Sequence, residues 1–158
     1  MAAGLIAASL ALAALAPEPL GGDARWAAFR WEDGRCEARG RGWRVLPDSQ
    51  RHRQPMISFL FEEGAAPYLH VRLRRAVAPN TRVQLVVDET PFLLTGEGHS
   101  AFAGSAEALA VIAALRTAAK LRVTARHRGG GRFTDYYPVG GVPAAIDAAA
   151  TGCARAPR

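Results

Sequence analysis

The feature that most constrains the fold is a pair of short segments near the C-terminal end in which apolar and polar residues alternate. Residues 120–127 place Leu121 and Val123 on one side of an extended chain and charged or polar residues on the other. Three glycines at positions 129–131 allow a tight turn, and residues 132–137 return with aromatic and β-branched side chains. This pattern predicts an antiparallel hairpin with one buried face.

The same two-residue period recurs upstream and predicts a mainly β protein. In residues 68–74, alternate positions are predicted to be buried (Leu69, Val71 and Leu73) or exposed (His70, Arg72 and Arg74). Further strands are predicted at residues 25–31, 35–39, 56–61, 83–87 and 92–95, with a turn at Pro79-Asn80 and a glycine-broken link at residues 96–100. Turn signals about every 8–12 residues favour an antiparallel β-sandwich, immunoglobulin-like or similar.

Two helices are predicted within this β framework, one central and one short and C-terminal. Residues 105–119 are rich in helix-forming residues, and Leu109 and Ile112 fall on one stripe that is predicted to pack on the sheet. Residues 143–150 begin with a proline and continue with good helix formers. This second helix is predicted to bring Cys153 back to the first hairpin.

The N-terminal residues 1–16 predict a secretory signal peptide. Their apolar run is too short to span a bilayer, and Ala14-Leu15-Ala16 fits a signal-peptidase site. An uncleaved anchor or a cytosolic apolar tail is the alternative, since no Lys or Arg precedes the run. The rest divides into a flexible lead (17–24), one β-sandwich domain (25–153) and a tail (154–158).

Cys36 and Cys153 are the only cysteines in the chain. An even pair in an exported protein is typical of a disulfide, so a bond between them is predicted, with two buried free thiols as the alternative. Neither cysteine has a CxxC partner or a histidine at ligand spacing. No metal site and no cofactor are predicted.

The formal net charge of +6 comes almost entirely from arginine, because Lys120 is the only lysine. The charge is dispersed, but three clusters are dense: Arg39, Arg41 and Arg44 around Trp43; Arg51, His52 and Arg53; and Arg126, His127 and Arg128 with Arg132. They are either solvated loop residues or a surface that meets envelope or host-surface components, such as anionic lipid headgroups or polysaccharide. The last two clusters form the predicted contact region. Specific nucleic-acid binding is not predicted, because the positive charge is dispersed and such binding would need one basic face. Its experimental sign would be an affinity that falls steeply with salt concentration.

Ser100 is the one residue that a catalytic motif singles out. The sequence from Gly98 to Phe102 nearly reads G-x-S-x-G, but Phe102 replaces the second glycine and the strand-to-helix context of a hydrolase is missing. No catalytic residue is therefore predicted. A periplasmic hydrolase that uses Ser100 and a histidine is the alternative.

Several features occur in an order that is similar to a known family. They are a tryptophan strand leading to Cys36, the paired residues 83–88 and 92–94, the apolar residues 108–115 before residues 121–123, and the closing residues 135–141 before Cys153. This order resembles the invasion-associated locus B family of exported proteobacterial envelope proteins. The resemblance implies a periplasmic or surface-exposed β-sandwich with no established enzymatic activity, associated with host-cell invasion. The predicted function is thus a non-enzymatic periplasmic or surface envelope protein that acts by binding through its surface.

Overall fold

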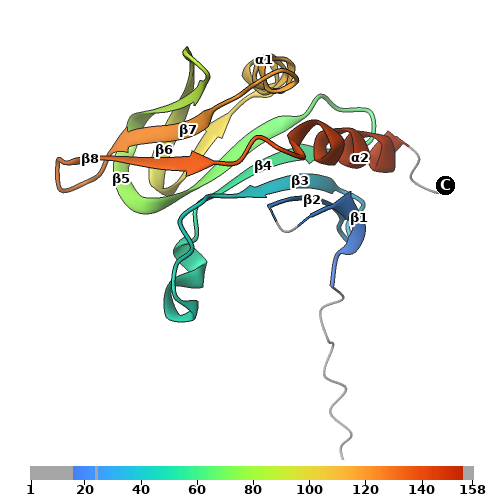
Figure 1. Ribbon diagram of the computed structural model, residues 1–158, viewed down its shortest axis with the longest axis horizontal. Coiled ribbons are helices and arrows are strands. Elements are labelled where there is room, and N and C mark those ends of the chain that lie inside the picture. The colour runs from blue at the N-terminus through green and yellow to red at the C-terminus, as the bar shows by residue number, and fades with distance from the viewer. Residues whose placement is uncertain (1–15, 24, 155–158) are drawn as a thin grey trace, which may run out of the picture.

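The computed structural model describes residues 16–23 and 25–154 (Figure 1). The strands in this part of the chain are β1 (Glu18–Gly22), β2 (Trp26–Arg30), β3 (Cys36–Arg41), β4 (Met56–Phe61), β5 (Tyr68–Val87), β6 (Thr90–Ala103), β7 (Leu121–Arg126) and β8 (Arg132–Tyr137). The helices are α1 (Ser105–Leu115), α2 (Val142–Ala154) and the 3-10 helix η1 (Asp48–Arg53). The predicted mainly β, antiparallel fold with a central and a C-terminal helix is confirmed.

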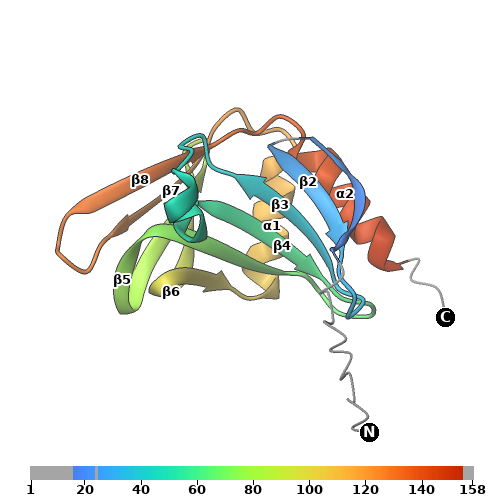
Figure 2. The ribbon, with the colours of Figure 1, turned by 90° about the horizontal axis from the view of Figure 1, so that it is seen from below.

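The long strand β5 organises the sheet because it belongs to two groups of strands. Its first part pairs with β4 and its last part with β7, while β6 follows its other edge along both parts. The strand order is therefore β1-β2-β3-β4-β5-β7-β8, with β6 paired to β5. Figures 1 and 2 show β5 and β6 curving between the two groups. The two layers of this sandwich-like fold are thus halves of one bent sheet.

Two breaks predicted from the sequence are bends inside continuous strands. A turn is predicted at Pro79-Asn80, but β5 runs through it with Asn80 at a φ of 58°. A link is predicted around Gly98, but β6 runs through it with Gly98 at a φ of 59°. The register of the β5–β6 pairing shifts between Arg72 and Val77 and again between Val77 and Thr81, and the pairing then continues. Extra unpaired residues on one strand bend it without ending the sheet, as in a β-bulge.

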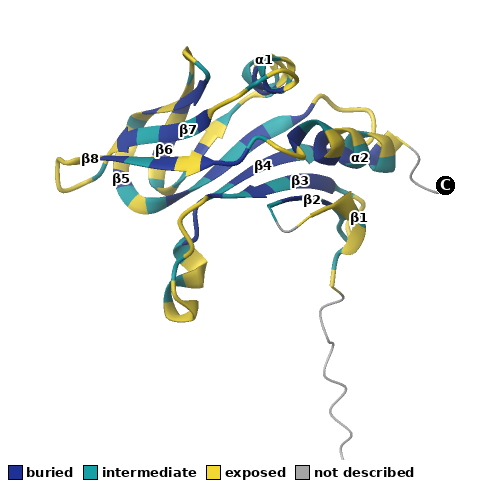
Figure 3. Cartoon of the chain, in the orientation of Figure 1, coloured by how far each residue is buried: buried dark blue, intermediate teal, exposed yellow. Residues whose placement is uncertain are grey.

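The alternating pattern of β5 produces the buried face of the sheet (Figure 3). The residues predicted to face inward (Leu69, Val71 and Leu73) are buried. The residues predicted to be exposed (His70, Arg72 and Arg74) are half-buried instead. The physical reason is that each contacts a partner: His70 stacks on Phe102, Arg72 donates to the Gln54 carbonyl and Arg74 pairs with Asp135.

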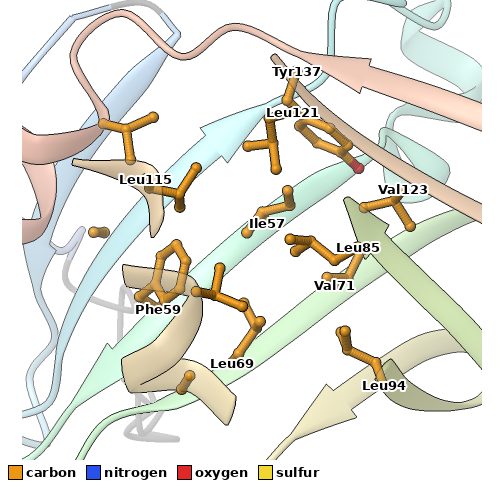
Figure 4. Packing of buried hydrophobic residues seen from close by; sticks show 14 of the residues in the cluster. Ile57, Phe59, Leu69, Val71, Leu85, Leu94, Leu115, Leu121, Val123 and Tyr137 are labelled. Atoms are coloured by element: carbon orange, nitrogen blue, oxygen red, sulfur yellow. The ribbon is translucent and has the colours of Figure 1, made fainter. Parts of the chain in front are cut away.

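The core lies between the two halves of the sheet and is closed by α1. Figure 4 shows side chains from β4, β5, β7 and α1 filling the same interior, including Ile57, Val71, Val123 and Leu115. Both α-helices lie on the same side of β3 and β4, and η1 lies on the opposite side (Figures 1 and 2). The side of β3 and β4 that faces away from the α-helices is therefore the side on which the loop with η1 lies.

Helix α1 packs with a different face from the predicted one. The stripe of Leu109 and Ile112 is predicted to be buried, but Leu109 is 50% exposed and Ile112 is only partly buried. The buried residues are Ala108, Val111 and Leu115. The helix also ends at Leu115, four residues before its predicted end. A small alanine at the contact lets the helix lie close to the sheet, and this favours the observed face.

Helix α2 covers the core-facing side of β2 and β3, and a disulfide fixes it there. Its buried residues are Val142, Ala145, Ile146, Ala149 and Cys153. Cys153 is bonded to Cys36 at the start of β3, with the Cα atoms 5.7 Å apart, as predicted. The Trp26 indole N–H donates to the Pro138 carbonyl over 2.7 Å and ties β2 to the segment before α2.

The predicted flexible lead at residues 17–24 is wrong, because β1 lies within it and pairs with β2. Arg30 forms a 3.0 Å ion pair with Glu18, and Leu20 packs against the core. Of the predicted signal peptide only Ala16 is described, and of the predicted tail only Ala154, which ends α2. Among the described residues, no helix is long and apolar enough to cross a membrane.

Candidate functional site

A row of outward-facing residues crosses β3, β4 and β5 on the side away from the helices. Arg41 pairs in register with Met56, and Met56 pairs with Arg72. These positions point outward because their sequence neighbours, such as Ile57 and Val71, face the core. Two arginines that are 31 positions apart in the sequence therefore lie two strands apart on one face.

The loop after β3 folds over this row and carries η1. The Gly42 N–H donates to the Pro55 carbonyl, which closes the loop at its base. The buried Gln54 side chain holds the interior of the loop: its oxygen accepts from the Leu46 N–H at 2.9 Å, and its nitrogen donates to the Arg44 carbonyl at 2.6 Å. This bracing gives η1 a defined place relative to the sheet.

A groove of about 640 Å³ lies between the loop and the outer face of the sheet. Its lining residues are Arg39, Arg41, Val45, Leu46, Asp48, Arg51, His52, Gln54, Met56 and Arg72. Four arginines and one histidine thus face a single carboxylate. We refer to this site as the cationic groove.

The charges of the cationic groove are only partly balanced within the protein. Arg51 pairs with Asp48 at 2.6 Å, and Arg39 pairs with Glu37 at 2.8 Å. Arg41 and Arg72 form no ion pair with any described carboxylate.

The two arginines without an ion pair are partly removed from water. The buried Nε of Arg41 has no hydrogen-bond partner among the described residues, and Arg72 donates its Nε–H to the Gln54 carbonyl at 2.8 Å. Burial, and after it the positive charge of Arg39, lower the pKa of the Arg72 guanidinium. A bound anion would relieve both effects, because it supplies the missing negative charge and acceptor atoms.

A buried carboxylate next to the cationic groove has a structural role. Glu37 accepts hydrogen bonds from Arg39, from the Trp31 indole and from the Ser58 hydroxyl. Burial by itself would raise the pKa of Glu37, but these hydrogen bonds outweigh it and hold the pKa below its usual value. Glu37 is fully engaged and fixes Arg39 at the edge of the groove.

The structure separates the two basic clusters that were predicted as a binding surface. Arg51 and His52 line the cationic groove, whereas Arg53 donates to Gln50 and does not line it. The second cluster (Arg126, His127, Arg128 and Arg132) lies at the β7–β8 hairpin. Both views show the tip of that hairpin apart from η1 (Figures 1 and 2).

Within the second cluster, the residues have different surroundings. Arg126 and Arg132 are cross-strand partners and line a smaller cavity of about 190 Å³ with Arg82. The His127 ring accepts a hydrogen bond from the Gly129 N–H within the glycine turn. His127 is thus committed to the turn.

Sequence reasoning missed the floor of the cationic groove. It places Arg41 in a basic cluster outside the predicted contact region, and it places Arg72 on a solvated strand face. The alternation of β5 indicates that Arg72 points outward. The strand register that brings Arg72 near Arg41 follows only from the fold.

Ser100 has a histidine partner, which is relevant to the hydrolase alternative. The Ser100 Oγ lies 3.1 Å from the His70 Nε2, and the His70 ring stacks on Phe102 with the ring centroids 4.7 Å apart. Burial is the main reason that the pKa of His70 lies below its usual value; Glu37 acts in the opposite direction. A neutral histidine at this distance can accept a proton from a hydroxyl group.

Neither Ser100 nor His70 lines the cationic groove, and Ser100 lies within the continuous strand β6. The strand-to-helix turn of a nucleophile elbow is therefore missing at this serine. Among residues 16–23 and 25–154, no cluster of three or more His, Cys, Asp or Glu side chains could hold a metal ion.

Comparison with known proteins supports the fold. No protein-family model matches the chain, and no curated protein sequence matches it. Among solved structures, the chain is similar to invasion associated protein B from Bartonella henselae. The TM-score is 0.53 at 15% sequence identity, over 77% of this chain and 89% of that one. The structural likeness extends over most of both chains and concerns the fold alone.

Proposed function

We propose that this chain is a non-enzymatic protein of the periplasm or cell surface that binds an anionic envelope or host-surface component through the cationic groove. The observation that carries the proposal is the pair Arg41 and Arg72. Both are partly buried, they lie on one sheet face, and neither has a described carboxylate partner. Two partly buried guanidinium groups without a carboxylate partner lower the free energy of unfolding, and a bound anionic ligand would offset that loss.

Two observations support the proposed location. The Cys36–Cys153 disulfide is typical of oxidising compartments, which include the periplasm and the cell exterior. One solved structure with a similar fold is that of a protein named for its association with invasion.

The proposal predicts that Arg41→Gln combined with Arg72→Gln weakens binding to heparin, a soluble sulfated polysaccharide, by about 100-fold or more. A hydrogen bond to a charged group contributes about 1.5–3 kcal/mol, which is roughly tenfold or more for each arginine. Isothermal titration calorimetry at fixed salt concentration measures the change. Circular dichroism on the same samples checks that the variant is folded.

The matched control removes the same charge elsewhere, with Arg126→Gln combined with Arg132→Gln at the β7–β8 hairpin. We expect this control to bind heparin within about threefold of the unaltered protein, since distant surface charges are screened by salt. An equal loss in both double variants would mean that net charge rather than the cationic groove drives binding, and it would contradict the proposal.

The second candidate function is the hydrolase reading, which the contact between Ser100 and His70 favours. If Ser100 were a nucleophile, Ser100→Ala would lower turnover of an activated ester such as p-nitrophenyl acetate by about 1000-fold or more. Our proposal expects the same slow rate in both proteins. Absorbance of the released nitrophenol measures the rate of turnover. His99→Ala, which changes a histidine outside the Ser100–His70 pair, is the control.

A further inference from the structure

A second concave site lies where the loop after β3 meets β7 and β8. It is a pocket of about 170 Å³ that is separate from the cationic groove. The buried side chains of Leu121 and Tyr137 form part of its lining, and Trp43 and Tyr136 add two exposed aromatic rings. We refer to this site as the aromatic pocket.

The two aromatic residues are held in place although their side chains are exposed. The Trp43 N–H donates to the Tyr136 carbonyl at 2.8 Å, so the loop is fixed to β8 at this point. The Arg25 guanidinium lies 4.5 Å from the centroid of the Trp43 ring and covers one face of it. Trp43 is 54% exposed and Tyr136 is 60% exposed. Large aromatic rings are usually buried, and two fixed, exposed rings beside a cavity are typical of a binding site.

Two cations complete the lining of the aromatic pocket. Lys120 is held at its backbone, where its N–H donates to the Asp88 carboxylate at 2.9 Å. The half-buried Arg122 reaches only the Asp88 carbonyl, at 3.4 Å. Neither Lys120 nor Arg122 forms an ion pair with a carboxylate in the described part of the chain. The pocket therefore offers aromatic surface and unbalanced positive charge in the same small volume.

We propose that the aromatic pocket binds an acidic sugar residue, a uronate within a polysaccharide or oligosaccharide. A uronate ring presents apolar C–H groups on one face and carries a carboxylate on the same ring. It can therefore stack on Trp43 or Tyr136 while Lys120 and Arg122 bind the carboxylate. A nucleotide fits less well, because the ribose separates its phosphate from the base that would stack. The proposal is independent of the cationic groove, which shares none of these residues.

The most direct experiment uses tryptophan fluorescence, because Trp43 is the most exposed of the three tryptophans. Trp26 is fully buried and Trp31 is half-buried, so a small ligand at the pocket changes mainly the Trp43 signal. We expect a saturable change on titration with trigalacturonate and none with maltotriose, which is neutral. No saturable change, or an equal change with maltotriose, would overturn the proposal, as would stronger binding of adenosine monophosphate.

Variants then locate the binding by calorimetry. Trp43→Ala and the double variant Lys120→Gln with Arg122→Gln are each expected to weaken trigalacturonate binding by about tenfold or more. The matched control, Arg128→Gln with Arg132→Gln, removes the same charge from the β7–β8 hairpin and is expected to bind within about twofold of the unaltered protein. If the double variant at the pocket binds as well as this control, the assignment is wrong. Should Trp43→Ala fail to fold, the double variant still decides the outcome.

Discussion

Replacing Cys36 by alanine is expected to lower the free energy of unfolding by about 4–5 kcal/mol, the largest single effect that the structure predicts for a conservative change. The bond joins residues 117 positions apart, so it removes a large amount of conformational freedom from the unfolded chain. Urea denaturation followed by circular dichroism measures the loss. Alanine keeps most of the volume of cysteine, which limits any cavity at this buried site.

Two further variants separate the contribution of the cross-link to stability from the contribution of the packing of the two cysteine side chains. Cys153→Ala should lose a similar amount, and the double variant should be no less stable than either single one, because all three lack the same bond. Adding a reducing agent to the unaltered protein should bring it near the stability of the variants. A double variant much less stable than the single ones would mean that the thiol packing, and not the bond, stabilises the fold.

Val111→Asp is expected to cost about 3–5 kcal/mol, since it places an unpaired charge in the core. Val111 is fully buried on the sheet-facing side of α1. The matched control is Leu109→Asp, two positions earlier on the same helix, where the side chain is half exposed. We expect the control to change stability by about 0.5 kcal/mol or less. Thermal denaturation of both variants compares the two faces, and the reverse order would mean that the helix packs as the sequence first suggests.

The face of α1 illustrates why some of the fold could not be predicted from the sequence. Its residues are apolar on nearly all sides, so a stripe with helical spacing can be drawn through Leu109 and Ile112 or through Val111 and Leu115. The choice depends on which side chains fit the space above the sheet. Ala108 is small enough for a close approach, and that space is a property of the assembled fold.

The buried faces of strands with a strict alternation were predicted correctly because their periodicity depends only on nearby residues. Leu69 and Val71 are buried as expected, and β7 and β8 pair as the predicted hairpin. Turn-forming residues were harder to interpret. Asn80 and Gly98 have the left-handed conformation of turns, but the strands continue past them because β5 and β6 bend together. Whether such a residue ends a strand depends on its partner strand.

The binding sites depend on contacts between segments that are distant in the sequence, which is why sequence clusters identified them only in part. The predicted cluster at Arg51 and His52 lines the cationic groove, but its floor needs the register between Arg41 and Arg72. The aromatic pocket likewise joins Trp43 to Tyr136 through one backbone hydrogen bond.

The position of α2 after all the described strands has a consequence for folding during synthesis. A ribosome makes β2 and β3 early, but the helix that covers their core-facing side is the last of the described elements to be made. Cys36 is made 117 residues before Cys153, so during that interval its thiol has no native partner. The apolar face around Trp26 is uncovered for the same period. Until α2 has been made, this face is therefore open to non-native contacts and the Cys36 thiol is open to non-native disulfides.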